Sequence, residues 1–251
     1  MEHIELILFF FAIAFVYASV GFGGGSSYLA VLALYALPFK EMRLIALICN
    51  IIVVTGGAIV FIKNKQFEGK KILPLVFVSV PLAFIGARMK LGEDVFFILL
   101  GCSLLIAAVL LWVKTKASEE IVAQKPNTVK DGIIGGAIGF LSGMVGIGGG
   151  IFLSPILNLM KWDTSKKIAA TASIFILVNS ISGLAGQLSY IPQDIDYKRI
   201  VILCCAVLVG GQLGSRMGAV KFNLLVVKRV TAVLVFVAGI EVLYKHLPWF
   251  K

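Results

Sequence analysis

The chain has 251 residues, of which 59% are hydrophobic and 14% are charged, and its mean hydropathy is +1.00. Because about a quarter of the residues of a soluble domain are charged, this composition excludes a soluble globular domain and predicts an integral membrane protein. The net charge of +10 would suggest a nucleic-acid partner in a soluble protein, but here Lys and Arg lie almost wholly in short loops. We therefore expect loops that are retained in the cytoplasm and contact anionic membrane lipid, and no nucleic-acid partner.

Long apolar runs predict transmembrane helices along the whole chain. Most of them are long enough to cross about 30 Å of hydrocarbon at about 1.5 Å per residue. The first run follows an N-terminus without the basic region and the cleavage site of a signal peptide, so we expect a retained helix there. An all-α polytopic membrane fold follows from these runs, which are 4–20, 44–62, 72–87, 95–113, 168–188, 200–214 and 224–243.

Two glycine clusters interrupt the apolar sequence. The pentad Gly-Phe-Gly-Gly-Gly at 21–25 recurs as Gly-Ile-Gly-Gly-Gly at 146–150, which is 125 residues later. Such a cluster breaks a helix, and lipid supplies no hydrogen bonds to the freed backbone. Each break must therefore face protein, water or a ligand.

The chain consists of two copies of one unit. Beyond the pentads, Gly-Ala-Arg-Met at 86–89 matches Gly-Ser-Arg-Met at 214–217, and Lys-Lys-Ile at 70–72 matches Lys-Arg-Ile at 198–200. The polar stretch 114–131 separates the copies. We expect one membrane domain over 1–251, with a first repeat at 1–113, a cytoplasmic linker at 114–131 and a second repeat at 132–251.

Positive charge predicts the relative orientation of the repeats. If each broken element is a hairpin tipped by the glycines, the 23 Lys and Arg residues divide 15 to 8 between the two membrane sides; if it crosses once, they divide 12 to 11. The hairpin gives the asymmetry that membrane proteins favour, and a helix over 26–37, about 18 Å long, is too short to cross alone. The sequence thus predicts two inverted-topology repeats, each a glycine-broken helical hairpin followed by three transmembrane helices, with both termini outside.

The short helix after each pentad is a candidate anion site. Its first N–H groups have no partner within the helix, its dipole places about half a positive charge there, and glycine lets a substrate approach. Close helix packing is the alternative explanation for clustered glycines; we prefer it for the glycines in 132–143 and prefer function for the pentads. The candidate substrate-binding residues at the breaks are Gly23, Gly24, Gly25, Ser26, Ser27, Gly148, Gly149, Gly150 and Ile151.

Polar residues inside apolar runs extend this candidate site. Asn50 and Thr55 lie in the helix after the first break, and its counterpart in the second repeat contains Thr171, Ser173, Asn179, Ser180 and Ser182. For Ser and Thr, a bond to their own helix backbone is the competing role. Arg88 and Arg216 are at the ends of equivalent helices, on opposite sides of the membrane. Each could attract an anion to the pathway entrance on its side. The alternative is that each bonds the last carbonyl groups of its helix and extends its charge to the membrane interface.

Groups for catalysis and metal binding are sparse. The histidines are His3 and His246, near the two ends of the chain, and acidic residues within apolar runs are limited to Glu5 and Glu241. The four cysteines lie in apolar runs, where packing is their expected role. We therefore expect no catalytic residues, no metal site, no cofactor and no enzyme activity.

The twin motifs, 21–25 followed by Ser26 and Gly-Met-Val-Gly-Ile-Gly-Gly-Gly at 143–150, resemble those of the TauE/SafE family of membrane permeases, often called sulfite exporters. The resemblance implies transport of a small sulfur-containing or organic anion, such as sulfite or a sulfonate, across the bacterial cytoplasmic membrane. It also implies that the two glycine motifs bind the substrate, although Ile151 stands where the first motif has Ser26.

These observations favour a secondary transporter, and an exporter, that works by alternating access around the two glycine loops. An anion channel is the nearest alternative. A membrane-embedded enzyme with Ser26 or Ser27 as nucleophile is a third.

Overall fold

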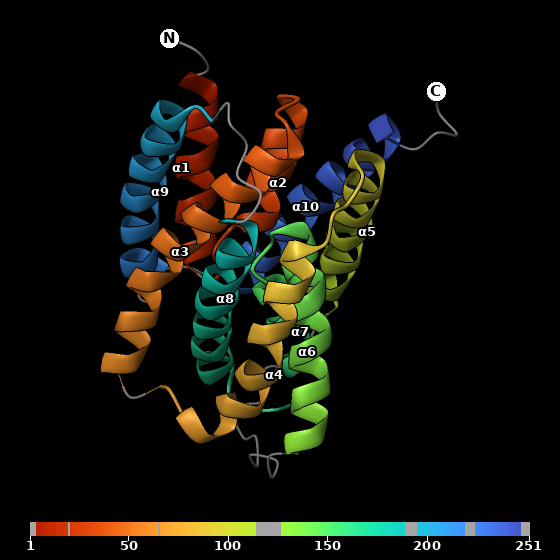
Figure 1. Cartoon of the computed structure of the whole chain (residues 1–251). Helices are drawn as coiled ribbons and strands as arrows, with labels where there is room; N and C mark the ends of the chain where they lie inside the picture. The colour runs from red at the N-terminus through yellow and green to blue at the C-terminus, as the bar shows by residue number, and fades with distance from the viewer. Residues whose placement is uncertain are drawn as a thin grey trace.

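A computed structural model of the chain describes residues 4–19, 21–64, 66–113, 127–188, 195–218 and 224–246. In these ranges it contains ten helices (Figure 1). They are α1 (Ile4–Ala18), α2 (Gly25–Leu34), α3 (Phe39–Lys63), α4 (Gly69–Arg88), α5 (Glu93–Trp112), α6 (Thr128–Val145), α7 (Gly150–Leu159), α8 (Ser165–Gln187), α9 (Tyr197–Gly218) and α10 (Leu224–His246).

The helices confirm the prediction of an all-α polytopic membrane protein. Within the described residues, α3, α4, α5, α8 and α9 are long and apolar enough to cross a membrane. By contrast, α1, α2 and α7 have only 15, 10 and 10 residues. A helix of ten residues is about 15 Å long, so the helix after each pentad is too short to cross by itself.

The two groups of five helices, α1–α5 and α6–α10, pack on each other rather than apart. Helix α1 packs on α9 as α6 packs on α4, and α2 contacts α10 as α7 contacts α5. The pairs α3–α8 and α5–α10 join corresponding helices of the two groups. Exchanging the two groups therefore reproduces the same contacts, and neither group forms a core of its own.

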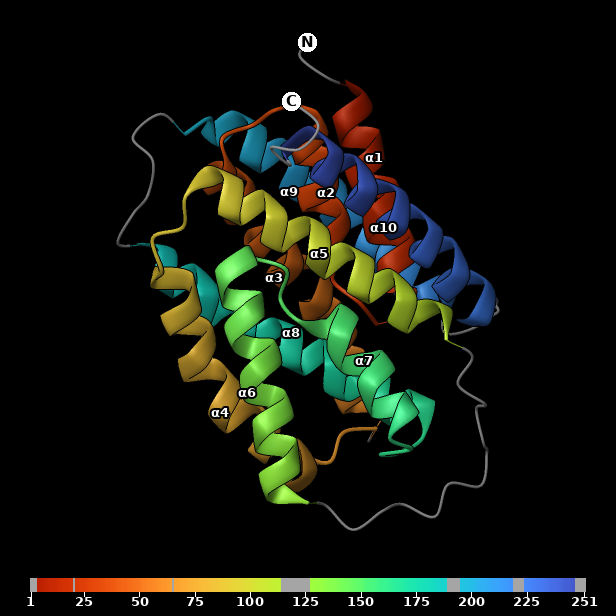
Figure 2. The same ribbon diagram turned by 90° about the vertical axis from the view of Figure 1, so that its right-hand side faces the viewer.

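The broken elements enter the bundle from different ends. In Figure 1, α1 runs from the N-terminal end to the middle and α2 returns, whereas α6 runs from the opposite end to the middle and α7 returns; Figure 2 agrees. Helix α6 begins at Thr128, before the expected repeat start at 132, because the Asn127 side chain accepts a hydrogen bond from Lys130 N and caps it. The rest of the expected linker lies outside the described residues.

Small residues bring two helix pairs into backbone contact. A methyl group added at Gly135, Gly139 or Gly143 of α6 would overlap or crowd the backbone of α4 at Leu75, Ser79 and Ala83. This confirms the packing role expected for these glycines. Helix α9 approaches α1 in the same way, since methyl groups at Gly210 and Gly214 would overlap the carbonyl oxygens of Phe11 and Phe15.

Ion pairs join the two groups at one end of the bundle. Lys71 of α4 lies 2.6 Å from the buried carboxylate of Asp163, and Lys167 of α8 pairs with Glu68. Burial raises the pKa of Asp163, but hydrogen bonds from Lys71 and from the amide of Thr164 outweigh it, so this pKa lies below its ordinary value. The hydrogen bond from Lys167 likewise lowers the pKa of Glu68.

At the other end, Arg199 of α9 lies 3.0 Å from Glu41 of α3 and 3.5 Å from Asp196. This contact also crosses between the two groups. Each end of the bundle therefore carries charged contacts between the groups, and the first turns of α4 and α9, which are equivalent helices, take part in them.

Candidate functional site

The two glycine breaks form matching helix starts, which we call glycine loop 1 (residues 21–24) and glycine loop 2 (residues 146–149). Gly24 and Gly149 have φ of 89° and 83°, a left-handed conformation that favours glycine, and neither helix has a side-chain cap. The backbone bonds of α2 and α7 start at these glycines: Tyr28 N donates to Gly24 O at 2.9 Å, and Phe152 N and Leu153 N both donate to Gly149 O at 3.1 Å. The N–H groups before these donors, at 25–27 in α2 and at 150 and 151 in α7, have no acceptor within the helix, so both helix starts present donors at mid-bundle.

Asn50 of α3 is the residue that joins the two loops. It is 0% exposed, and its Nδ2 donates to the carbonyl oxygen of Ile147 at 2.9 Å. A methyl group added at Gly23 would overlap Asn50 Oδ1, and one added at Gly25 would overlap Nδ2. A methyl group at Gly148 would lie 2.8 Å from the same Nδ2. The absence of a side chain at these glycines therefore lets one amide contact both loops.

The loops also contact each other. A methyl group added at Gly25, the first residue of α2, would lie 2.8 Å from the carbonyl oxygen of Ile147 in glycine loop 2. The two uncapped helix starts thus lie together around Asn50, although the residues that form them are more than a hundred positions apart in sequence.

Three buried polar atoms beside this junction have no hydrogen-bond partner among the described residues: Asn50 Oδ1, Ser180 Oγ and the hydroxyl of Tyr28. Ser180 Oγ lies 2.9 Å from the position of a methyl group on Gly148, and the Tyr28 hydroxyl lies 3.0 Å from one on Gly24. Buried polar atoms in proteins are almost always hydrogen-bonded. With the helix starts, these atoms give the junction both donors and an acceptor for a small polar ligand.

Each loop is held by the long central helix of the other group. Ser173 of α8 donates to the carbonyl oxygen of Gly21 at 2.8 Å, while Asn50 of α3 holds Ile147 in glycine loop 2. Ser173 also donates to Ala169 O at 3.0 Å, which is the competing bond to its own helix. Movement of α3 against α8 would therefore move both loops.

Hydroxyl groups lie at the start of α2 and not at the start of α7. The Oγ of Ser27 and the hydroxyl of Tyr17 are 2.6 Å apart, and Ser26 is buried beside them. At the equivalent place in α7 is the buried side chain of Ile151. The two helix starts are therefore chemically unequal.

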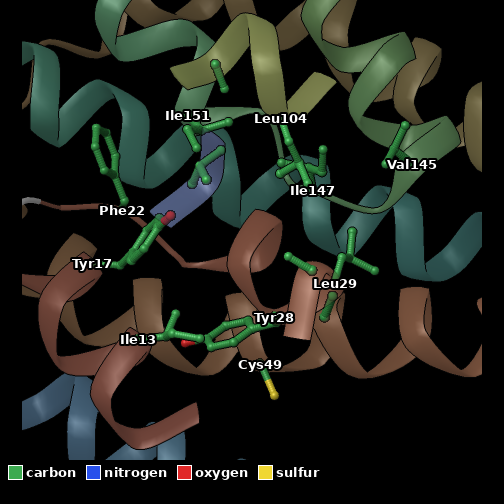
Figure 3. Packing of buried hydrophobic residues seen from close by; sticks show 14 of the residues in the cluster. Ile13, Tyr17, Phe22, Tyr28, Leu29, Cys49, Leu104, Val145, Ile147 and Ile151 are labelled. Carbon is green, nitrogen blue, oxygen red and sulfur yellow. The ribbon is translucent and has the colours of Figure 1, made fainter. Parts of the chain in front are cut away.

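Apolar side chains surround the junction. Tyr17, Phe22 and Tyr28 of the first group belong to the same buried hydrophobic cluster as Ile147 and Ile151 of the second, which Figure 3 draws. Exclusion of water lowers the local dielectric constant and strengthens every hydrogen bond and dipole at the loops.

Other predicted residues lie away from this junction. Asn179 donates to Ser79 Oγ at 3.0 Å and to Phe175 O at 2.8 Å, so it takes part in the contact between α8 and α4. Thr171 is buried in α8. Arg88 and Arg216 are exposed, and Arg88 lies 5.6 Å from the ring centroid of Phe84.

Three residues at or near the junction were not predicted from the sequence: Tyr17, Tyr28 and Arg43. The hydroxyls of Tyr17 and Tyr28 carry no sequence signal, because each is one of many polar groups in an apolar run. Arg43 was counted as a charge at the membrane surface, but it is 5% exposed. Its position one turn inside a long helix, rather than in a loop, was the sequence signal that could have indicated its burial.

The paired glycine breaks in a helical membrane bundle agree with the comparison to known families. The model described as "Sulfite exporter TauE/SafE" matches residues 6–242 of the chain. The chain belongs to the TauE/SafE family. The match spans both groups of helices and both glycine loops, so the site lies within the part that the family shares.

Relatives of this TauE/SafE protein agree on the class of function. The probable membrane transporter protein y4hK of Sinorhizobium fredii is 30% identical over 249 residues, with 97% of this chain and 99% of the relative covered. The probable membrane transporter protein YunE of Bacillus subtilis is 24% identical over 216 residues, which cover 78% of each chain. No solved structure matches the chain. Family and relatives indicate a multi-pass membrane transporter rather than an enzyme.

Proposed function

We propose that this protein is a secondary transporter that exports a small sulfur-containing or organic anion, such as sulfite or a sulfonate, across the bacterial cytoplasmic membrane. The substrate binds between the starts of α2 and α7, beside Asn50. The ligand-contacting residues are the glycines of the two breaks, Ser26, Ser27, Asn50 and Ser180, while Ser173 holds glycine loop 1 in place. Thr171 and Asn179 contribute through the packing of α8.

The single observation that carries this proposal is the contact of Asn50 with both glycine loops. Two helix starts without caps offer free N–H donors, and each helix end favours an anion by about 0.3–2 kcal/mol. Two such ends bind an oxyanion reversibly without a lysine at the junction. Reversible binding is what a carrier needs, since the substrate must leave on the other side.

The arrangement of the two groups supports a mechanism of alternating access in which they are inverted-topology repeats and the linker is in the cytoplasm. Their contacts are exchanged pair by pair, and each end carries ion pairs between them: Lys71 with Asp163 and Lys167 with Glu68 at one end, and Arg199 with Glu41 at the other. When one group rocks against the other, the ion pairs at one end of the bundle break while those at the opposite end stay formed. The site therefore opens to one side of the membrane at a time.

The exposed arginines have a separate role in this proposal. Arg88 and Arg216 attract anions to the two mouths of the pathway by long-range electrostatics. Salt screens such an effect, so Arg88→Ala and Arg216→Ala should reduce uptake more at low salt than at high salt. Unchanged uptake in both variants removes this role.

A channel and an enzyme are the competing functions. A channel gives flux that does not saturate and is not stimulated by substrate on the opposite side of a liposome membrane. An enzyme with Ser27 as nucleophile needs a base beside it, but the hydrogen-bond partner of Ser27 Oγ is the hydroxyl of Tyr17, 2.6 Å away. A chemical change in the substrate that Ser26→Ala or Ser27→Ala abolishes would favour the enzyme.

The decisive test changes the charge at Asn50. Asn50→Asp keeps the size of the side chain, removes the donor to Ile147 O and adds a negative charge beside the helix starts. We expect the purified variant to lose at least tenfold in affinity for sulfite or methanesulfonate, measured by thermal shift and calorimetry, because a hydrogen bond to a charged group contributes about 1.5–3 kcal/mol. Asn158→Asp, near the outer end of α7, is the matched control.

Two outcomes contradict the proposal: no stabilisation of the wild-type protein by any small anion, or equal anion binding in Asn50→Asp and the wild type. Topology is tested separately. Cysteines placed near the N-terminus and in the linker should show opposite accessibility to an impermeant thiol reagent in intact cells.

A further inference from the structure

Arg43 is a charged residue inside the bundle that the proposed mechanism does not yet use. It lies in the second turn of α3 and is 5% exposed. Its Nη2 donates to Gly143 O at 2.9 Å and to Ala87 O at 3.3 Å, and its Nε is buried without a hydrogen-bond partner among the described residues.

The charge of Arg43 is only partly compensated. Gly143 and Ala87 lie in the last turns of α6 and α4, where the helix dipole is negative and helps to hold a cation. No carboxylate of the described residues forms an ion pair with this guanidinium. A buried charge in a membrane protein is costly and typically pairs with an opposite charge or serves a functional site. Arg43 therefore leaves an excess of positive charge inside the bundle.

This charge lies next to the glycine-loop site. The Cβ and Cγ atoms of Arg43 would be 3.3 Å from a methyl group on Gly146, the first residue of glycine loop 2. Arg43 also precedes Asn50 by seven residues, which places it two turns away on the same face of α3, about 10 Å along the helix. The helix that positions Asn50 between the loops thus places the stem of the Arg43 side chain beside glycine loop 2, and the guanidinium is bonded to Gly143, three residues before that loop.

The second group of helices has no equivalent charge. Gly21 of glycine loop 1 corresponds to Gly146, and the central helix that contacts it does so through Ala169 and Ser173 of α8. A neutral alanine occupies the place that Arg43 takes at glycine loop 2. Packing of the loops does not require an arginine there, since the equivalent contact is made without one.

We propose that Arg43 is the charge-selecting residue of the glycine-loop site, whose positive charge makes the site prefer an anion over a neutral molecule of the same shape. This inference rests on the proposed function. A charge about 10 Å from a bound anion, at an effective dielectric constant of about 20, changes its affinity by roughly tenfold. The same charge leaves the affinity for a neutral molecule unchanged.

The test compares methanesulfonate with methanesulfonamide, an anion and a neutral molecule of nearly the same shape. Their affinities are measured by calorimetry, directly or as competitors of sulfite, for the full-length protein and for Arg43→Gln and Arg43→Lys. Gln keeps one donor for the carbonyl oxygens but removes the charge, and Lys keeps the charge. Lys63→Gln, at the exposed end of the same helix, is the control for a loss of charge elsewhere.

We expect Arg43→Gln to bind methanesulfonate about tenfold more weakly with no change for methanesulfonamide, and Arg43→Lys and Lys63→Gln to stay within about threefold of the wild type. Equal losses for both molecules in Arg43→Gln, or no loss for either, overturn the inference and leave Arg43 as a cap for α4 and α6. If Arg43→Gln does not fold, Arg43→Lys decides, because a folded Lys variant with a tenfold loss for the anion also overturns it. The Asn50→Asp variant tests the proposed function independently of Arg43. If the proposed function is wrong, Asn50→Asp binds anions as the wild type does, whatever the Arg43 variants show.

Discussion

Glycine loop 1 and glycine loop 2 have nearly the same sequence but different surroundings. Glycine loop 1 has the hydroxyls of Ser27 and Tyr17 beside its helix start, whereas glycine loop 2 has Ile151 at that place and Arg43 behind it. The backbone of each loop supplies a similar helix start, and the side chains around it differ. The two halves therefore repeat the backbone shape of the loop. The hydroxyl groups lie beside glycine loop 1, and the buried positive charge lies beside glycine loop 2.

The largest expected difference between the halves concerns the first residue of each short helix. Gly25→Ala places a methyl group against the Asn50 amide and 2.8 Å from Ile147 O, so Asn50 must move and its bond to Ile147 must break. Gly150→Ala meets the side chain of Ile176, which can change rotamer without losing a hydrogen bond.

We expect Gly25→Ala to lose at least tenfold in anion affinity and Gly150→Ala to lose clearly less, both measured by calorimetry. Gly92→Ala is the control, because nothing lies within 4 Å of an added methyl group there. Equal losses at Gly25 and Gly150 would mean that Asn50 does not distinguish the two loops.

A smaller effect is expected from the hydroxyl pair of the first half. Ser27→Ala leaves the hydroxyl of buried Tyr17 without its 2.6 Å partner, which costs about 1–3 kcal/mol of unfolding free energy. The double variant Tyr17→Phe with Ser27→Ala should be more stable than the sum of the two single variants predicts, because it leaves no polar group unpaired. Thermal unfolding of the wild type, the two single variants and the double variant measures the coupling energy between the two hydroxyls. If the two losses of stability simply add, Tyr17 and Ser27 do not act as a coupled pair.

The smallest effect compares the ion pairs at the two ends. Asp163 has a lowered pKa, so its contribution to stability is present above the ordinary value near 3.8 and is lost as the pH falls through the folded value. We expect Asp163→Asn to lower the unfolding free energy at pH 7 by about 2 kcal/mol and to lose less on acidification below about pH 4 than the wild type. Glu41→Gln, at the other end, gives the matched comparison by thermal unfolding. A stability difference that persists unchanged at pH 3 would contradict this role of the carboxylate.

Most of the helices were predictable because their signal is local. An apolar run with a length matched to the bilayer predicts a helix whatever its neighbours are, and all seven predicted runs correspond to helices of the structure, with ends that differ by a few residues. The glycine breaks were predictable for the same reason. The helix starts extend outward where a capping residue, such as Asn127, provides a hydrogen bond that hydropathy does not detect.

The candidate site was only partly predictable. The glycines and Asn50 were proposed because glycine clusters and a lone amide are rare in apolar sequence, and the structure brings them together. Asn179 has the same sequence signal but lies in a contact between α8 and α4, and Arg43 resembled a surface charge although it is buried. Sequence distinguishes residue types, but the partner of Asn50 is 97 residues away, and only the fold brings the two together.

Hydropathy and backbone propensity act over a single turn or a single helix. The sequence was therefore enough to indicate a helical membrane protein with two matching glycine breaks, one in each half. Tertiary structure decided that both breaks meet at one asparagine, that the hydroxyls lie on one side, and that an arginine lies inside the bundle. Those features depend on contacts between helices of different halves, and close approach of two backbones is set by packing in three dimensions.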